Sequence, residues 1–177
     1  MPVGEGVRGI NDLKIAVLTG DTPGVNTDVV GIKSFSIEVT SDSDEQRGDD
    51  AVLMVVQENK ALDVSFASAY ANLAALAVVT ATTLGTSGSG STEIITFSDP
   101  ASANTSYVQI TGQAKGRDAN GSALRATVLK AQLTGGPNLD FGEGAWLEPE
   151  LTFTGVGRGS PSILYTLASY ATLAAIT

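Results

Sequence analysis

Two residue types on which many enzymes rely are missing from this chain of 177 residues, which contains no cysteine and no histidine. Without cysteine there are no disulfides and no thiolate chemistry. Without histidine the chain has neither the commonest general base nor the commonest metal ligand. The remaining residues show no nucleophile paired with a base and no ligand set with the spacing of a metal site. The sequence therefore predicts no enzyme, no catalytic residue, no metal and no cofactor.

Positive charge is also scarce, because 10 Lys and Arg residues stand against 19 Asp and Glu residues, which gives a net charge of −9. Nonspecific binding to nucleic acid and docking on anionic lipid both depend on Lys and Arg. No apolar run approaches the roughly 20 residues of a membrane span, and the first residues lack the pattern of a signal peptide. We therefore expect no sequence-independent binding to nucleic acid and no membrane anchor.

Charged residues of either sign make up only 16% of the chain, which is below the usual quarter. The surface must then be rich in neutral polar groups, or other chains must cover much of it. The length favours a single domain over residues 1–177, with an N-terminal arm at 1–12 and a C-terminal tail at 160–177.

Alternating apolar and polar residues predict a mainly β fold. The expected architecture is two packed antiparallel sheets, as a sandwich or small barrel, with one short helix on one side. Asn59-Lys60 is expected to form a turn, and residues 117–121 a second turn that ends in Asn-Gly. The expected strands are residues 13–18, 32–40, 51–58, 61–66, 93–97, 107–114, 124–133, 139–141 and 145–154.

One helix is predicted in the alanine-rich residues 67–79, where Tyr70, Leu73 and Ala77 have the spacing of a single helical face and would pack on the sheet. The tail, residues 163–177, fits a helix or a strand. Its residues 170–176 (YATLAAI) match residues 70–76 (YANLAAL), which we interpret as chance similarity between two alanine-rich segments.

Residues 41–50 form the most acidic stretch and are predicted to be a long loop between two strands. The stretch exceeds the two to five residues that are usual in a hairpin, and we expect a loop of this kind to be functional or disordered. Its spacing approaches that of a calcium loop but fails at Arg47 and Leu53. Residues 85–92 are expected to be flexible, and residues 135–138 to end a strand. The candidate residues of the acidic loop are Asp42, Asp44, Glu45, Arg47, Asp49 and Asp50.

Several segments occur in an order that resembles a known family. The segments are residues 13–18 (LKIAVL), 20–24 (GDTPG), 74–79 (AALAVV), 130–133 (KAQL) and 139–146 (LDFGEGAW). With the acidic hairpin between the second and third strands, this order resembles the major tail tube proteins of long, non-contractile-tailed bacteriophages, the siphophage tail tube family. The resemblance spans roughly residues 13–153.

That resemblance implies a structural virion protein with two packed β-sheets and a flanking helix, similar to contractile-phage and type VI secretion tubes. It implies homohexameric rings that stack into a hollow tail tube, which conducts phage DNA during ejection without binding it specifically. The implied partners are copies of the chain itself and other tail proteins, such as the tape measure and the tail terminator. The implied location is the virion tail, assembled in the host cytoplasm.

The resemblance also implies roles for residues. The acidic loop would bridge adjacent rings, and the polar residues of the inner sheet would face the channel. The channel candidates are Ser34, Ser36 and Glu38, with Glu148 and Glu150, which lie two residues apart on an expected strand.

Two other function classes fit a β-rich acidic chain. A β-sandwich binding or adhesion module would need exposed aromatic residues, and only 6% of the residues are aromatic. A capsid decoration protein is also compatible with the composition.

Overall fold

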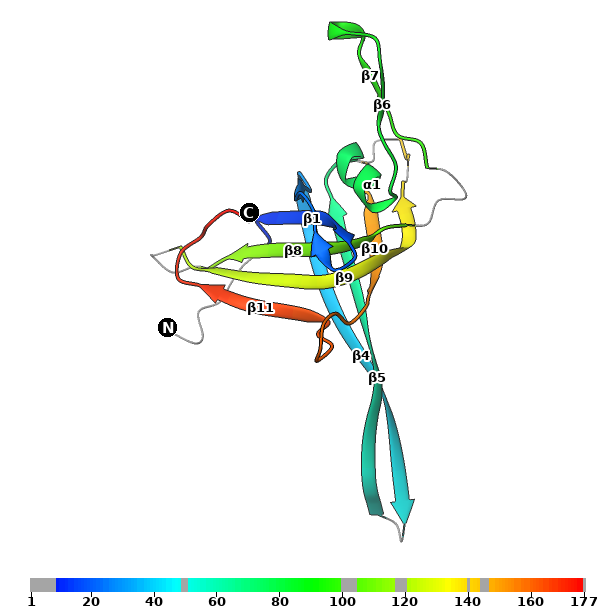
Figure 1. Ribbon diagram of the computed structural model, residues 1–177, viewed down its shortest axis with the longest axis vertical. Coiled ribbons are helices and arrows are strands. Elements are labelled where there is room, and N and C mark those ends of the chain that lie inside the picture. The colour runs from blue at the N-terminus through cyan, green and yellow to red at the C-terminus, as the bar shows by residue number, and fades with distance from the viewer. Residues whose placement is uncertain are drawn as a thin grey trace.

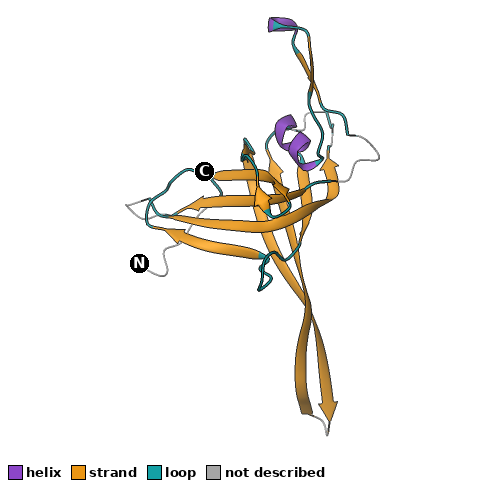
Figure 2. Ribbon diagram, viewed as in Figure 1, coloured by secondary structure: helices purple, strands orange, loops and turns teal. Residues whose placement is uncertain are grey.

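The structure is a computed structural model that describes residues 9–48, 51–99, 105–116, 121–139, 141–143 and 147–176. Strands dominate these ranges (Figures 1 and 2), and the prediction of a mainly β fold with one short helix is confirmed. In the same ranges, none of the helices has the length and hydropathy to traverse a bilayer. The elements are β1 (Asp12–Thr19), β2 (Thr22–Pro23), β3 (Thr27–Asp28), β4 (Ile32–Gly48), β5 (Ala51–Ser68), α1 (Leu73–Val79), β6 (Gly85–Ser87), the 3₁₀-helix η1 (Gly90–Thr92), β7 (Ile94–Thr96), β8 (Tyr107–Lys115), β9 (Ala123–Asn138), β10 (Glu150–Gly155) and β11 (Tyr165–Tyr170).

Most strands belong to one antiparallel sheet in the order β2-β1-β8-β9-β10-β5-β4, with β11 added to β9 and β3 to β1. β9 is long enough to hold two partners on one side, because β11 pairs with residues 123–128 and β10 with residues 131–138. A separate two-stranded sheet consists of β6 and β7. In place of the two packed sheets that were expected, the described residues form one large curved sheet and one small, separate hairpin.

The large sheet curls over itself, so that β4 and β8, which are far apart in the strand order, meet face to face. The close approach is made at Gly112 of β8, where an added Cβ would lie 2.5 Å from the ring of Phe35 on β4. Figure 1 shows β4 and β5 crossing over β1, β8 and β9. This crossing encloses a single core, whose buried side chains are Leu13, Ile15, Val29, Leu62, Val64, Phe66, Ala75, Leu76, Val79, Val108, Ile110, Val128, Ala131, Leu151 and Phe153.

The aromatic centre of the core joins two neighbouring strands. Phe66 of β5 and Phe153 of β10 stack with ring centroids 5.6 Å apart and planes inclined by 20°. Both rings are almost completely buried. Burial of an aromatic side chain contributes about 1.5–3 kcal/mol, so this pair fixes the position of β5 against the rest of the sheet.

α1 covers one end of the core and is shorter than predicted, because it begins at Leu73. The Asn72 side chain caps the helix by accepting a hydrogen bond from the Ala75 amide at 3.2 Å, and it donates one to the Asp28 carbonyl at 2.8 Å. Ala77 is buried and Leu73 packs against the core, as expected. The expectation for Tyr70 is wrong, since this residue precedes the cap and is 50% exposed.

The predicted acidic loop is largely strand. β4 continues to Gly48 and pairs with β5, which continues from Ala51, so that the two strands leave the body as a long ribbon (Figure 1). Asp49 and Asp50 lie outside the described residues. The expected turn at Asn59-Lys60 is instead a β-bulge, because the partners shift from Thr40 with Ala61 to Asp42 with Glu58. The apolar residues of β5 supply strand-forming partners for the acidic residues, and the sequence argument ignored this pairing.

Other boundaries also differ from the predictions. Residues 85–92 hold β6 and η1, and with β7 they form a hairpin. β9 continues through residues 135–138 with register shifts against β10. Leu139 and Phe141 are not in strands, and Trp146 lies outside the described residues. The ambiguous tail contains a strand, β11. The β8–β9 pairing is the expected hairpin, although residues 117–120 of its turn are outside the described residues.

The contact of Gly112 with Phe35 leads to a stability prediction. Gly112→Ala should lower the free energy of unfolding by about 1–3 kcal/mol, because the new methyl group forces the Phe35 ring out of place. Gly136→Ala in β9 is the matched control, since an added Cβ there has no neighbour within 4 Å. Thermal or urea unfolding measures both. Equal stability of the two variants would contradict the face-to-face contact of β4 with β8.

Candidate assembly surfaces

One face of the sheet formed by β4, β5 and β10 points away from the core and is polar except for Ala67, which lies between Ser34 and Glu150. Register places Ser36 opposite Ser65 and Ser65 opposite Thr152, while the alternate residues Phe35, Phe66 and Leu151 point inward. We call this surface the polar face. Its members on the three strands are Ser34, Ser36, Glu38, Asp63, Ser65, Glu150, Thr152 and Thr154.

The polar face carries carboxylates and no cation among these members. Glu38 stands directly opposite Asp63, and none of the ion pairs between described residues involves Glu38, Asp63 or Glu150. Like charges opposite each other destabilise an antiparallel pair. The arrangement therefore does not serve the stability of the single chain.

The predicted channel candidates fall into two groups. Ser34, Ser36, Glu38 and Glu150 lie together on the polar face. Glu148 precedes β10 and forms an ion pair with Lys33, so the expectation that it shares a strand with Glu150 is wrong. The alternation of β5 already placed Asp63 and Ser65 on its polar side. Register with β4 was needed to bring them beside Glu38.

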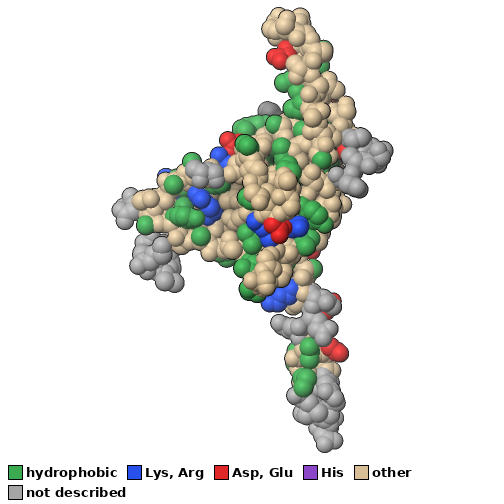
Figure 3. Space-filling model, viewed as in Figure 1, with side chains coloured by type: hydrophobic (Ala, Val, Ile, Leu, Met, Phe, Trp, Pro, Cys, Tyr) green, Lys and Arg blue, Asp and Glu red, His purple; other side chains and the backbone are tan. Residues whose placement is uncertain are grey.

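The second surface is the ribbon of β4 and β5 beyond Thr40, which we call the arm (residues 41–48 and 51–60). At about 3.3 Å per residue, the eight residues of β4 in the arm extend roughly 25 Å. Met54 and Val55 are 55% and 54% exposed. They face Gln46 and Glu45 across the ribbon, and Figure 3 shows apolar side chains next to carboxylates there.

The hydrophobic pattern of the arm differs from that of an ordinary solvent-exposed hairpin. Residues 51–56 (AVLMVV) are apolar without interruption, and successive strand residues point to opposite faces. Such a run is typical of strands buried on both faces. Within the single chain, Met54, Val55 and Val56 are exposed, so these three residues lack the burial that the composition of the run predicts.

A third surface was missed by the sequence analysis. β6, η1 and β7 form a hairpin that projects from the end of the body opposite the arm (Figure 1). Gly88, with φ of 79°, forms its tip, where an added Cβ would collide with the Thr92 backbone. Ile94 and Ile95 are 61% and 51% exposed. The Gly-Ser composition of residues 85–92 predicted a flexible segment. The sequence analysis therefore did not identify the Ile-Ile pair that follows this segment as an exposed surface.

Two of the longer strands of the large sheet have an open edge. Within the described part of the chain, β4 is paired only with β5, and β11 only with β9. An unpaired strand edge presents free N–H and C=O groups to another chain. The chain therefore offers open strand edges in addition to its two projections.

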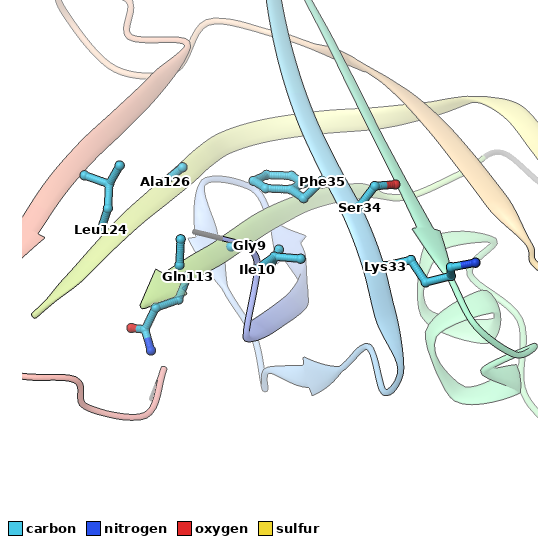
Figure 4. A pocket seen from close by; sticks show the side chains of 10 residues that line it. Gly9, Ile10, Lys33, Ser34, Phe35, Gln113, Leu124 and Ala126 are labelled. Atoms are coloured by element: carbon cyan, nitrogen blue, oxygen red, sulfur yellow. The ribbon is translucent and has the colours of Figure 1, made fainter. Parts of the chain in front are cut away.

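An open groove of about 370 Å³ lies beside the first part of β4. Figure 4 shows Phe35 and Ser34 from β4, Gln113 from β8, and Leu124 and Ala126 from β9 around it. Lys33 is the single charged group of its lining, and Glu148 neutralises it. The groove thus brings together apolar and backbone groups, and no acid–base pair lines it. No group of three His, Cys, Asp or Glu suited to a metal occurs in the described residues.

The segment after β11 is fastened by one arginine. Arg125 of β9 donates to the Gln113 side-chain oxygen at 2.7 and 3.1 Å and to the carbonyls of Ala174 and Ala175 at 3.1 and 3.4 Å. Its guanidinium also lies 4.6 Å from the centroid of the Tyr170 ring. Gln113 is only 2% exposed, so the arginine satisfies a buried amide and holds the end of the chain beside β9.

Comparison with known proteins gives distant likeness in structure alone. No protein-family model matches the chain, and the sequence matches no curated protein. Among solved structures, the chain is similar to a chain of the anti-feeding prophage (AFP) baseplate, determined by cryo-EM with 6-fold symmetrisation. The identity is 9%, the match covers 95% of this chain and 97% of that chain, and the TM-score is 0.45.

Arg125→Ala should release the C-terminal segment. We expect faster deuterium uptake at residues 171–176 and a loss of about 1–3 kcal/mol in unfolding free energy, because the Gln113 amide loses its partner. Arg158→Ala is the control, since Arg158 donates to the Leu129 and Asp21 carbonyls instead. Hydrogen–deuterium exchange with mass spectrometry makes the comparison. Equal uptake at residues 171–176 in both variants would rule out the arginine as the fastening.

Proposed function

We propose that this chain is a structural subunit of a phage tail, of the tail tube type, which assembles with copies of itself into stacked six-membered rings. The observation that carries the proposal is the arm, whose continuous apolar strand, residues 51–56, extends from the body with Met54, Val55 and Val56 exposed. Another chain must cover such a strand if it is to be buried. The low charged fraction and the order of segments that resembles tail tube proteins support the same conclusion.

The open edges suit a ring. A head-to-tail contact that closes by rotation produces a ring, and a sheet that continues from copy to copy removes its exposed edges. In the proposed ring, the free edge of β4 meets a strand of the neighbouring copy. Each copy then contributes its strands to a barrel that encloses the channel.

The polar face suits the wall of that channel. Duplex DNA carries one negative charge per about 1.7 Å of its axis. A wall of hydroxyl groups with Glu38, Asp63 and Glu150 repels phosphates and gives DNA no site to bind, so the duplex slides. In this proposal the unfavourable pair of Glu38 and Asp63 is retained for passage of DNA rather than for stability.

The proposal includes no catalytic role and no cofactor, since the groove beside β4 has an apolar lining and a neutralised lysine. Its partners are copies of the chain and, at the ends of the tube, other tail proteins such as the tape measure and the terminator. Its location is the virion tail, after assembly in the host cytoplasm.

Removal of the arm tests the proposal. Replacing residues 42–59 with Asn-Gly should leave a folded subunit, because the core lies outside the arm and Asn-Gly closes a two-residue hairpin. We expect tubes from the wild-type protein in negative-stain micrographs and none from the shortened protein. Circular dichroism and thermal unfolding confirm the fold. Tubes of normal length from the shortened protein, or a wild-type protein that stays monomeric at high concentration, would contradict the proposal.

Glu38→Lys tests the channel wall with two measurements, the stability of the single chain and the retention of DNA by assembled tubes. The lysine stands opposite Asp63, so the single chain should gain about 0.2–1 kcal/mol of stability. Tubes of this variant should retain short duplex DNA that is present during assembly, which co-sedimentation measures. Glu143→Lys, the same change outside the polar face, is the control. Equal DNA retention by the two variants would show that Glu38 does not line the channel.

A further inference from the structure

The two projections of the molecule point in opposite directions. The arm leaves one end of the body, and the β6–β7 hairpin leaves the other (Figure 1). Both are two-stranded ribbons, and a ribbon of two strands is marginally stable in water unless something packs against it. When copies stack head to tail, the arm of one copy reaches the end of the next copy from which the hairpin projects.

The exposed apolar side chains of the two ribbons match in kind and in placement. Met54 and Val55 on the arm, and Ile94 and Ile95 on the hairpin, are each more than half exposed. Each pair consists of consecutive strand residues, so both faces of each ribbon present one of them. Two ribbons laid side by side would bury apolar groups that neither can bury within its own chain.

Charge favours the hairpin as the place where the acidic arm binds. The arm carries Asp42, Asp44, Glu45 and Glu58 against Arg47 and Lys60, so it has a net negative charge, whereas residues 85–92 (GTSGSGST) carry no charge, and Glu93 is the single charged residue from 85 to 97. The hairpin, with Glu93 as its single charged residue, therefore offers the arm an apolar contact with little repulsion.

We infer that the arm of one copy packs against the β6–β7 hairpin of the next copy along the tube, with Met54, Val55 and Val56 against Ile94 and Ile95. This inference rests on the proposed function, since it requires stacked copies. An overlap of about 20 Å between ribbons about 10 Å wide buries about 400 Å² in total. A stable pair of proteins needs about 1,200 Å² or more. One such contact is therefore too small to hold two free subunits together. It forms only between stacked rings, where every copy of the ring makes the same contact at once.

Disulfide cross-linking tests the inference directly, because the chain has no cysteine of its own. The variant Val55→Cys/Ile95→Cys is assembled under reducing conditions, oxidised, and separated on a non-reducing gel. We expect a ladder of dimers, trimers and longer chains, since each copy would be linked to the next. The control, Val55→Cys/Thr166→Cys, has its second cysteine at an exposed position of β11 and should stay largely unlinked.

A second variant tests the contact without cross-linking. Ile94→Thr/Ile95→Thr keeps strand-forming side chains but removes most of the apolar contact, so the subunit should stay folded and stacking should be lost. Val25→Thr, at an exposed loop residue, is the control and should assemble normally.

The outcomes separate the inference from the proposed function. A ladder in the first variant and lost stacking in the second support the inference. Assembled tubes with no ladder, with dimers only, or with normal stacking of the threonine variant would overturn the inference and leave the proposed function standing. A wild-type protein that forms neither rings nor tubes would overturn both.

Discussion

The antiparallel pairing of β4 with β5 is the constraint on which the other features of this molecule depend. Near the body, the two strands bury Phe66 and Val64 in the core and present Ser36 and Glu38 on the polar face. Beyond Thr40, the same ladder continues as the arm. One pair of strands therefore contributes to the core, the candidate channel wall and the candidate contact between rings. The bulge at residues 58–61 marks the place where the ladder leaves the body.

The composition suits a surface that meets other copies of the same chain. A chain with few charges and exposed apolar strands would be prone to nonspecific association. On the arm, each exposed apolar residue of β5 faces a polar or acidic residue of β4: Val55 faces Glu45, and Val56 faces Asp44. These carboxylates discourage pairing between arms, because identical ribbons would bring like charges together. A ribbon with a single charged residue, such as the hairpin with Glu93, meets less of this repulsion.

Much of the architecture could be predicted because local pattern and tertiary environment agree. The alternation in residues 32–40 matches the side of β4 that each residue faces, and residues 13–18 form β1. Period alone placed Ser34, Ser36 and Glu38 on the polar side of β4. The acidic residues of β4 and the Gly-Ser segment before β7 were assigned wrongly, because their strand structure comes from partners elsewhere in the chain. Asp63 became a candidate only when register placed it opposite Glu38.

The sequence by itself determined the fold class, the faces of the regular strands and the chemistry that the chain lacks, because each depends on residue type and local period. The tertiary structure alone decided where strands end and which surfaces remain uncovered. Two similar segments illustrate the difference. Residues 70–76 lead into the helix α1, whereas residues 170–176 begin at the last residue of the strand β11 and continue beyond it. Asn72 caps the first segment and α1 packs on the core, while Tyr170 pairs with Ala123 and Arg125 holds the second. Short alanine-rich segments have weak preferences of their own, so the hydrogen bonds and apolar contacts available nearby decide their conformation.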